Sequence, residues 1–193
     1  VDLQGTLQTI GGNFTSNGTS LTTSLAASIT TSGGNVTINN TGAVDLNLGV
    51  NTSGGAGGAL SVSAASSFDS TGGALQTNNA NIDLTGVTGA VTIGGAASTN
   101  GGNFLADGTN FTNSGGAIST TGGNVTVDNT GVIDLNSGID TTGAAGGAIT
   151  FSAGSSFDNT GGILSTDNAA IGLTITNNVL VAAAVDTGGG TFN

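Results

Sequence analysis

The sequence predicts an all-β fold, a right-handed parallel β-helix (β-solenoid) of about nine coils of roughly 22 residues each, without helices. Three observations predict it: a long internal repeat, short stretches in which every second residue is apolar, and a composition with 37 Gly and no Pro among 193 residues. One coil of such a fold is too small to bury a core alone. Stacking of successive coils therefore has to supply the core.

The chain consists of long units that repeat at an offset of 89 residues, or 90 before residue 29. The stretch "GGALSVSAASSFDSTGG" (57–73) returns as "GGAITFSAGSSFDNTGG" (146–162), and "GGNVTINNTGAVDLN" (33–47) returns as "GGNVTVDNTGVIDLN" (122–136). We therefore expect a single solenoid over 1–193, with units at about 1–90 and 91–178 and the start of a third at 179–193. Such a chain is expected to be an excerpt of a longer array.

Short strands are expected between glycine pairs. The pairs that recur in both units begin at positions 11, 33, 57, 72, 101, 122, 146 and 161. Between them, apolar residues alternate with polar ones, as in Val36/Ile38, Val44/Leu46/Leu48, Leu60/Val62 and Ile82/Leu84. Alternation over four to six residues, bounded by Gly, Asn, Asp and Ser, predicts β-strands. Gly and Asn suit the corners, where stacked Asn and Thr can form hydrogen-bonded ladders.

The apolar residues indicate which side chains face inward. Leu60 and Val62 are replaced by Ile149 and Phe151 in the second unit, so their size changes while they stay apolar. As large core residues we predict Phe14, Phe104, Phe192, Phe68 and Phe157. A β-sandwich is the alternative, but it needs antiparallel hairpins and usually an aromatic core, and the chain has seven Phe and neither Trp nor Tyr. The sequence itself does not fix the handedness.

The composition excludes several classes of function. The chain has no Lys, Arg, His or Cys, and its 11 acidic residues give a net charge of -11. Without cationic side chains it cannot neutralise phosphates, so we predict no nucleic-acid partner. No apolar run approaches the roughly 18 residues of a membrane span, so we predict no membrane insertion. Disulfide and thiolate chemistry are excluded as well.

Asp is the only titratable side chain, and two carboxylates could in principle act as general acid and base. However, Asp107 corresponds to Asn17 and Asp128 to Asn39 in the other unit. Asn keeps hydrogen bonding but removes the charge, so we predict that the protein is not an enzyme and has no cofactor. Asp45, Asp134, Asp69 and Asp158 are Asp in both units and are weak candidates for sporadic calcium binding. Alternatively, Asp69 and Asp158 cap turns through their own backbone.

Three further motifs give weaker evidence about function. "GGAGG" lacks the Lys and the helix of a phosphate-binding loop. Thr-rich faces raise ice binding as a hypothesis, but the Thr residues cluster in "TTSGG"-like corners and do not repeat on one strand. Whether the Asn-x-Ser/Thr sequons carry glycans depends on export through a glycosylating pathway. They lie at Asn13, Asn17, Asn35, Asn39, Asn51, Asn110 and Asn124.

The stretches "GGNVT", "TG-x-IDLN" and "GSSFDNTGG" resemble the repetitive β-helical shafts of large secreted bacterial surface proteins, the filamentous-haemagglutinin-like and autotransporter-type adhesins. The resemblance covers essentially the whole chain and lies in its texture, not in a diagnostic motif. It implies a β-helix, export across a bacterial envelope and a surface or matrix role. It carries over no functional residue, and the secretion-signal region expected at the start of such proteins is absent from these residues.

Two functions are expected from these observations. The first is a non-enzymatic extracellular structural protein, a solenoid shaft or fibre-forming subunit. Its partner is itself, through open end coils, or the flanking repeats of the same chain. The alternative is an adhesin segment at the bacterial cell surface that binds glycan or another surface through one solenoid face.

Overall fold

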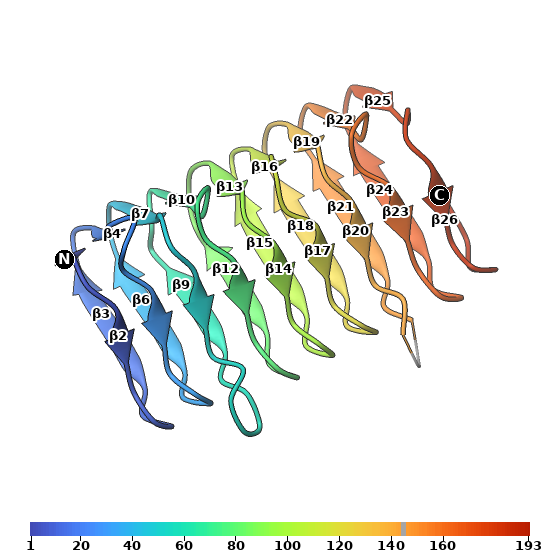
Figure 1. The fold of residues 1–193 in the computed structure, drawn as a ribbon. Helices are drawn as coiled ribbons and strands as arrows, with labels where there is room; N and C mark the ends of the chain where they lie inside the picture. Colours follow the sequence, from blue (N-terminus) through green and yellow to red (C-terminus); the bar gives the residue numbers. More distant parts are fainter. Residues whose placement is uncertain (144–145) are drawn as a thin grey trace.

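The computed structural model describes residues 1–143 and 146–193, and within them every regular element is a β-strand. The strands form three sheets, and all strand pairs in the sheets are parallel. The chain runs from the first sheet to the second, then to the third, and returns one level further along (Figure 1). One such circuit is called a coil here. The two termini lie at opposite ends of the resulting rod.

The first sheet, sheet A, takes one strand from each coil and has nine strands. They are β1 (Asp2–Leu3), β4 (Leu21–Thr23), β7 (Ala43–Leu46), β10 (Ser67–Asp69), β13 (Val91–Ile93), β16 (Phe111–Asn113), β19 (Ile133–Leu135), β22 (Ser156–Asp158) and β25 (Asn178–Leu180). Because these strands have only two to four residues, most of them present at most two side chains to solvent.

The second sheet, sheet B, also has nine strands, each of them only two residues long. They are β2 (Leu7–Gln8), β5 (Ile29–Thr30), β8 (Val50–Asn51), β11 (Leu75–Gln76), β14 (Ala97–Ser98), β17 (Ile118–Ser119), β20 (Ile139–Asp140), β23 (Leu164–Ser165) and β26 (Val185–Asp186). Each presents one apolar residue to the core and one polar residue to solvent.

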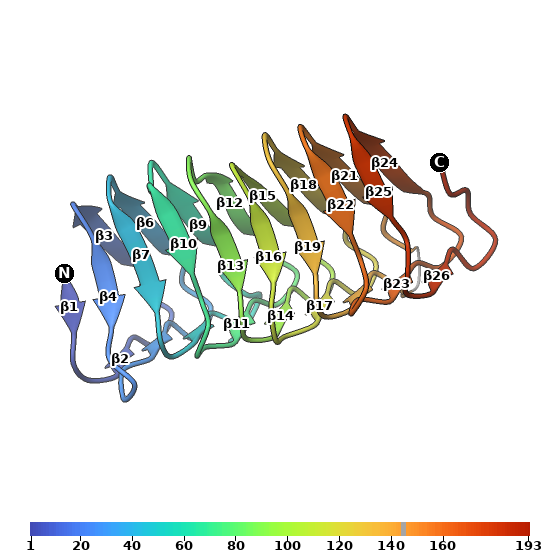
Figure 2. The same cartoon turned by 90° about the horizontal axis from the view of Figure 1, so that it is seen from above.

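The third sheet, sheet C, has eight strands of four or five residues, so most of its strands are longer than those of the other two sheets. They are β3 (Phe14–Gly18), β6 (Val36–Asn40), β9 (Leu60–Ser63), β12 (Ile82–Gly86), β15 (Phe104–Gly108), β18 (Val125–Asn129), β21 (Ile149–Ala153) and β24 (Ile171–Ile175). Figure 2 shows this sheet behind sheet A, with sheet B closing the section below. Eight coils thus contribute to all three sheets, and a ninth contributes only β25 and β26, which confirms the expected β-solenoid.

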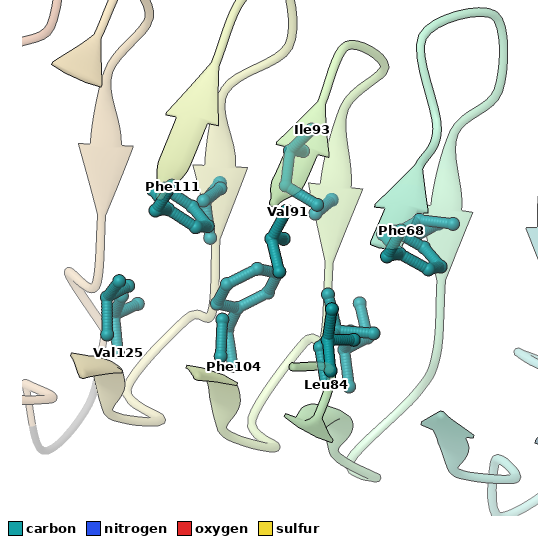
Figure 3. Packing of buried hydrophobic residues seen from close by; sticks show 14 of the residues in the cluster. Phe68, Leu84, Val91, Ile93, Phe104, Phe111 and Val125 are labelled. Atoms are coloured by element: carbon teal, nitrogen blue, oxygen red, sulfur yellow. The ribbon is translucent and has the colours of Figure 1, made fainter. Parts of the chain in front are cut away.

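The coils enclose one continuous apolar core from Leu21 to Ile171. Identical positions of successive coils stack in rows. The inward row of sheet A runs Leu21, Val44, Phe68, Val91, Phe111, Ile133, Phe157. Figure 3 shows Phe68, Val91 and Phe111 of this row beside Phe104 from sheet C. Large and small side chains alternate along the row, which lets neighbouring coils interlock.

The Phe residues predicted for the core differ in position. Phe68, Phe104 and Phe157 are buried, and Phe14 is partly buried against the core. Phe192 does not lie in the core: it is 47% exposed, because it pairs only with Ile171 on one side and no strand of sheet C follows it. Phe111 and Phe151 are also fully buried.

A buried Thr ladder lines the corner between sheets B and C. In every coil, the hydroxyl of a Thr that follows the sheet B strand donates a hydrogen bond to the carbonyl of a Gly or Ala just before sheet C. The donors are Thr9, Thr31, Thr52, Thr77, Thr99, Thr120, Thr141, Thr166 and Thr187. The ladder ties each corner to itself while the backbone bonds tie neighbouring coils together.

An Asn ladder runs along the outside of the same corner. The side-chain oxygens of Asn13, Asn35, Asn81, Asn103 and Asn124 each accept a hydrogen bond from a backbone N–H of the next coil. These bonds lie between 2.8 and 2.9 Å. The expected Asn ladder between coils is therefore present, whereas the Thr hydroxyls are buried and make their short bonds within their own corner. Where the sequence lacks Asn, as at Ala59, the preceding Asn still serves the N–H of that coil.

The glycine at this corner allows the close approach of the coils. A Cβ atom on Gly58 would lie 2.1 Å from the carbonyl oxygen of Gly34, and a Cβ on Gly34 would lie 2.2 Å from that of Gly12. Backbone of the preceding coil fills the space that a side chain would need. This explains why the second Gly of these pairs recurs in seven of the nine coils, with Ala80 and Ala169 at this position in the other two.

Candidate functional site

The four Asp residues singled out in the sequence lie on one outward row of sheet A. This row runs Asp2, Thr22, Asp45, Asp69, Thr92, Thr112, Asp134, Asp158 and Leu180. Asp45 is paired in register with Asp69, and Asp134 with Asp158. The structure therefore brings the candidates together as two pairs, one in each sequence unit. We call this row the sheet A acidic row.

Within each pair, one carboxylate is engaged in a turn. Oδ1 of Asp158 accepts hydrogen bonds from the backbone N–H of Thr160 at 2.7 Å and from its hydroxyl at 2.6 Å. Asp69 bonds Thr71 in the same way. The hydroxyl and then the backbone N–H of Thr160 hold the pKa of Asp158 below its ordinary value. These contacts are those of a turn cap.

The pairs offer few of the oxygens that a cation needs. Ca²⁺ takes six to eight oxygen ligands. In the described part of the chain, no three acidic side chains come close enough together to hold a metal ion. Each pair supplies two carboxylates, of which one already caps a turn. Calcium binding by Asp45, Asp69, Asp134 and Asp158 stays a prediction.

A second acidic group lies on the outward face of sheet C. Asp107 and Asp128 are in register on β15 and β18, and Asp83 lies on β12, one coil before Asp107. Burial, followed by the charges of Asp128 and Asp83, raises the pKa of Asp107 above its ordinary value. In the sequence, these residues were matched only with their counterparts one unit away. A search at the 21-residue length of this coil would have placed Asp107 beside Asp128.

The beginning of sheet C carries an uncharged ladder. The hydroxyl of Ser63 donates to Oδ1 of Asn39 at 2.5 Å, and Nδ2 of Asn39 donates to Oδ1 of Asn17 at 3.0 Å. All three side chains point outward, in neighbouring coils. They form a polar line along the rod axis with a repeat of about 4.8 Å.

Among residues 1–143 and 146–193, no helix is long and apolar enough to cross a membrane. Comparison of the chain with protein-family models, with curated proteins and with solved structures gives no match. The fold and its registers therefore supply the grounds on which a function is proposed.

Proposed function

We propose that the chain is a structural segment, a β-solenoid shaft or fibre-forming subunit that functions outside the cell. The observation that carries this proposal is the unbroken stack: each sheet continues from one end of the rod to the other without a change of direction. Each strand has few outward positions, and most of the residues there are polar. Backbone and Asn side-chain hydrogen bonds join each coil to the next along the whole rod. Such a structure suits a long and durable shaft. The resemblance to the shafts of bacterial surface adhesins supports the same role.

The ends of the rod support propagation of the stack. The last coil leaves Val179 49%, Leu180 50% and Phe192 47% exposed. Val179 continues the inward row of sheet A and Phe192 that of sheet C. Strands at a sheet edge present free N–H and C=O groups that template further pairing. A second copy of the chain, or further coils of a longer one, would cover both the apolar rows and these backbone groups.

A concentration series tests self-assembly. Sedimentation velocity and electron microscopy of the purified chain should show rods that lengthen with concentration. Val179→Asp, which places a charge in the apolar end row, should abolish lengthening. Thr112→Asp, at an outward position of the interior strand β16, is the matched control and should assemble as the unmodified chain does. A monomer at every concentration would remove self-assembly and leave only the role of a segment in a longer array.

A second candidate function is glycan binding by one face of the solenoid. The uncharged ladder of Asn17, Asn39 and Ser63 favours it, because sugar hydroxyls pair with amide and hydroxyl groups. Specific, saturable binding of the purified chain on a glycan array, reduced at least tenfold by Asn39→Ala and unchanged by Asn51→Ala on sheet B, would place this function above the structural one.

A further inference from the structure

The corner between sheets C and A contains an Asn whose side chain has no protein partner. Asn129, the last residue of β18, is 3% exposed. Neither its Nδ2 nor its Oδ1 is bonded to another group among the described residues. An unsatisfied buried amide costs about 1–3 kcal/mol, so it calls for an explanation.

The other buried Asn residues of the chain show that this is unusual here. Nδ2 of Asn113 donates to the carbonyl of Ser137 at 2.7 Å, and its Oδ1 accepts from the N–H of the same residue at 3.3 Å. Nδ2 of Asn159 donates to the carbonyl of Gly162, and its Oδ1 accepts from the N–H of Ala182. Both use the donor and the acceptor side of the amide. Only Asn129 and, in part, Asn40 do not.

The neighbours of Asn129 in the stack are small. Asn129 is in register with Gly108 of the preceding coil and Ala153 of the following one. Neither Gly108 nor Ala153 has a polar side-chain group, so neither of these neighbours offers the amide of Asn129 a side-chain partner.

The first sequence unit shows what bonds the amide oxygen at this corner. Asn40 is the counterpart of Asn129 and is fully buried. Its Oδ1 accepts a hydrogen bond from the hydroxyl of Ser16 at 3.1 Å. Ser16 corresponds to Ala106 in the sequence repeat, and Ala106 is buried in the coil before Asn129 as Ser16 is in the coil before Asn40. Ala106 has no hydroxyl, so in the second unit the group that bonds the amide oxygen is missing from the chain itself.

We propose that the corner at Asn129 is a binding site for one buried water molecule. A partner of this amide must accept from Nδ2 and donate to Oδ1, which requires a small neutral group that does both. Water meets the requirement, and buried waters typically bond about three otherwise unsatisfied polar groups. Its oxygen takes the place that the hydroxyl of Ser16 has beside Asn40.

The reciprocal pair of variants Ala106→Ser and Ser16→Ala tests the site. Nuclear Overhauser spectra of the labelled full chain should show a cross-peak from the Asn129 side-chain amide protons to a long-lived water. Ala106→Ser supplies a hydroxyl and should remove that cross-peak. Ser16→Ala should create a water cross-peak at Asn40. Asn113, which is bonded on both sides, serves as the internal control and should show none.

A crystal structure of the unmodified chain keeps the test independent of the variants. It should show a water within about 3 Å of both Asn129 polar atoms. An amide that bonds only protein groups in that structure overturns the proposal. A water cross-peak that survives Ala106→Ser overturns it as well.

Discussion

At the scale of the residue, the corners after the buried Thr ladder demand a left-handed backbone. Asn79, Asn100 and Asn168 adopt positive φ there, at 60°, 48° and 60°. Asn tolerates this conformation because its short polar side chain can bond locally. In two other coils, Ser32 and Thr121 adopt this conformation, with φ at 50° and 52°. A β-branched residue such as Thr121 is strained there.

Thr121→Asn should therefore stabilise the protein by about 1 kcal/mol. Thr121 is exposed and its side chain makes no hydrogen bond within the described residues, so the substitution removes strain and little else. Urea denaturation of the full chain measures the change. Asn100→Thr, the reverse exchange at the equivalent corner, should lower the midpoint. Equal stability of both variants and the unmodified chain would show that the corner is not strained.

Individual residues also show where sequence reasoning reaches its limit. The period-two alternation placed Val36, Ile38, Leu60 and Val62 correctly in the core, because most inward strand positions are apolar. The buried Thr residues were not foreseen. In the sequence they belong to polar corner clusters such as "TTSGG", and only the fold shows that one hydroxyl per corner turns inward to reach a carbonyl.

At the scale of the element, the aromatic residues connect sheets within the stack. Phe104 of sheet C meets Phe111 of sheet A edge to face, with ring centroids 6.1 Å apart and planes at 75°. Phe111 was missed because its strand, "FTN", has one apolar residue between polar neighbours. Its counterpart Leu21 in the first unit could have revealed it. The core is built by stacking one inward residue from each coil, so the apolar pattern within a single short strand does not reveal it.

Phe104→Ala should destabilise the protein by about 3–5 kcal/mol, because it leaves a cavity between two coils. Phe192→Ala, at the half-exposed end of the same sheet C row, should cost less than about 1.5 kcal/mol, since its ring is covered on one side only. Chemical denaturation followed by circular dichroism compares the two. A similar cost for both would mean that burial within the stack does not determine stability.

The outward Asp residues on sheet C predict a dependence of stability on pH. The folded-state pKa of Asp107 is raised, so the folded chain binds this proton more tightly than the unfolded chain does. Acidification from neutral pH towards about pH 4 should therefore raise the stability, because protonation removes first the cost of burying the carboxylate and then its repulsion by Asp128 and Asp83.

Denaturation midpoints across this pH range measure that gain, and Asp107→Asn should flatten it. Asp158 has the opposite sign: its pKa is lowered, so its contribution is present above the ordinary value of 3.8 and is lost as the pH falls further. A pH profile that Asp107→Asn leaves unchanged would contradict the assignment.

At the scale of the whole molecule, the four-coil period organises the rod. Residues equivalent in the sequence repeat, such as Val36 and Val125, lie four steps apart in sheet C. The repeat length and the glycine spacing predicted the coil size well, because each coil has its own turn residues. The handedness stays a prediction. The assignment of rows to faces needed the registers, since successive coils are offset by 20 to 25 residues and do not align at one fixed offset.

The distance between two exposed residues of one row tests the parallel stack most directly. Thr15 and Thr150 face outward on sheet C, and six coil steps separate them. The chain has no Cys, so Thr15→Cys and Thr150→Cys can carry a unique pair of spin labels. Pulsed electron spin resonance should give a narrow distribution centred at about 29 Å between the backbone positions. A broad distribution, or a maximum displaced by more than about two coil spacings, would contradict the parallel stack.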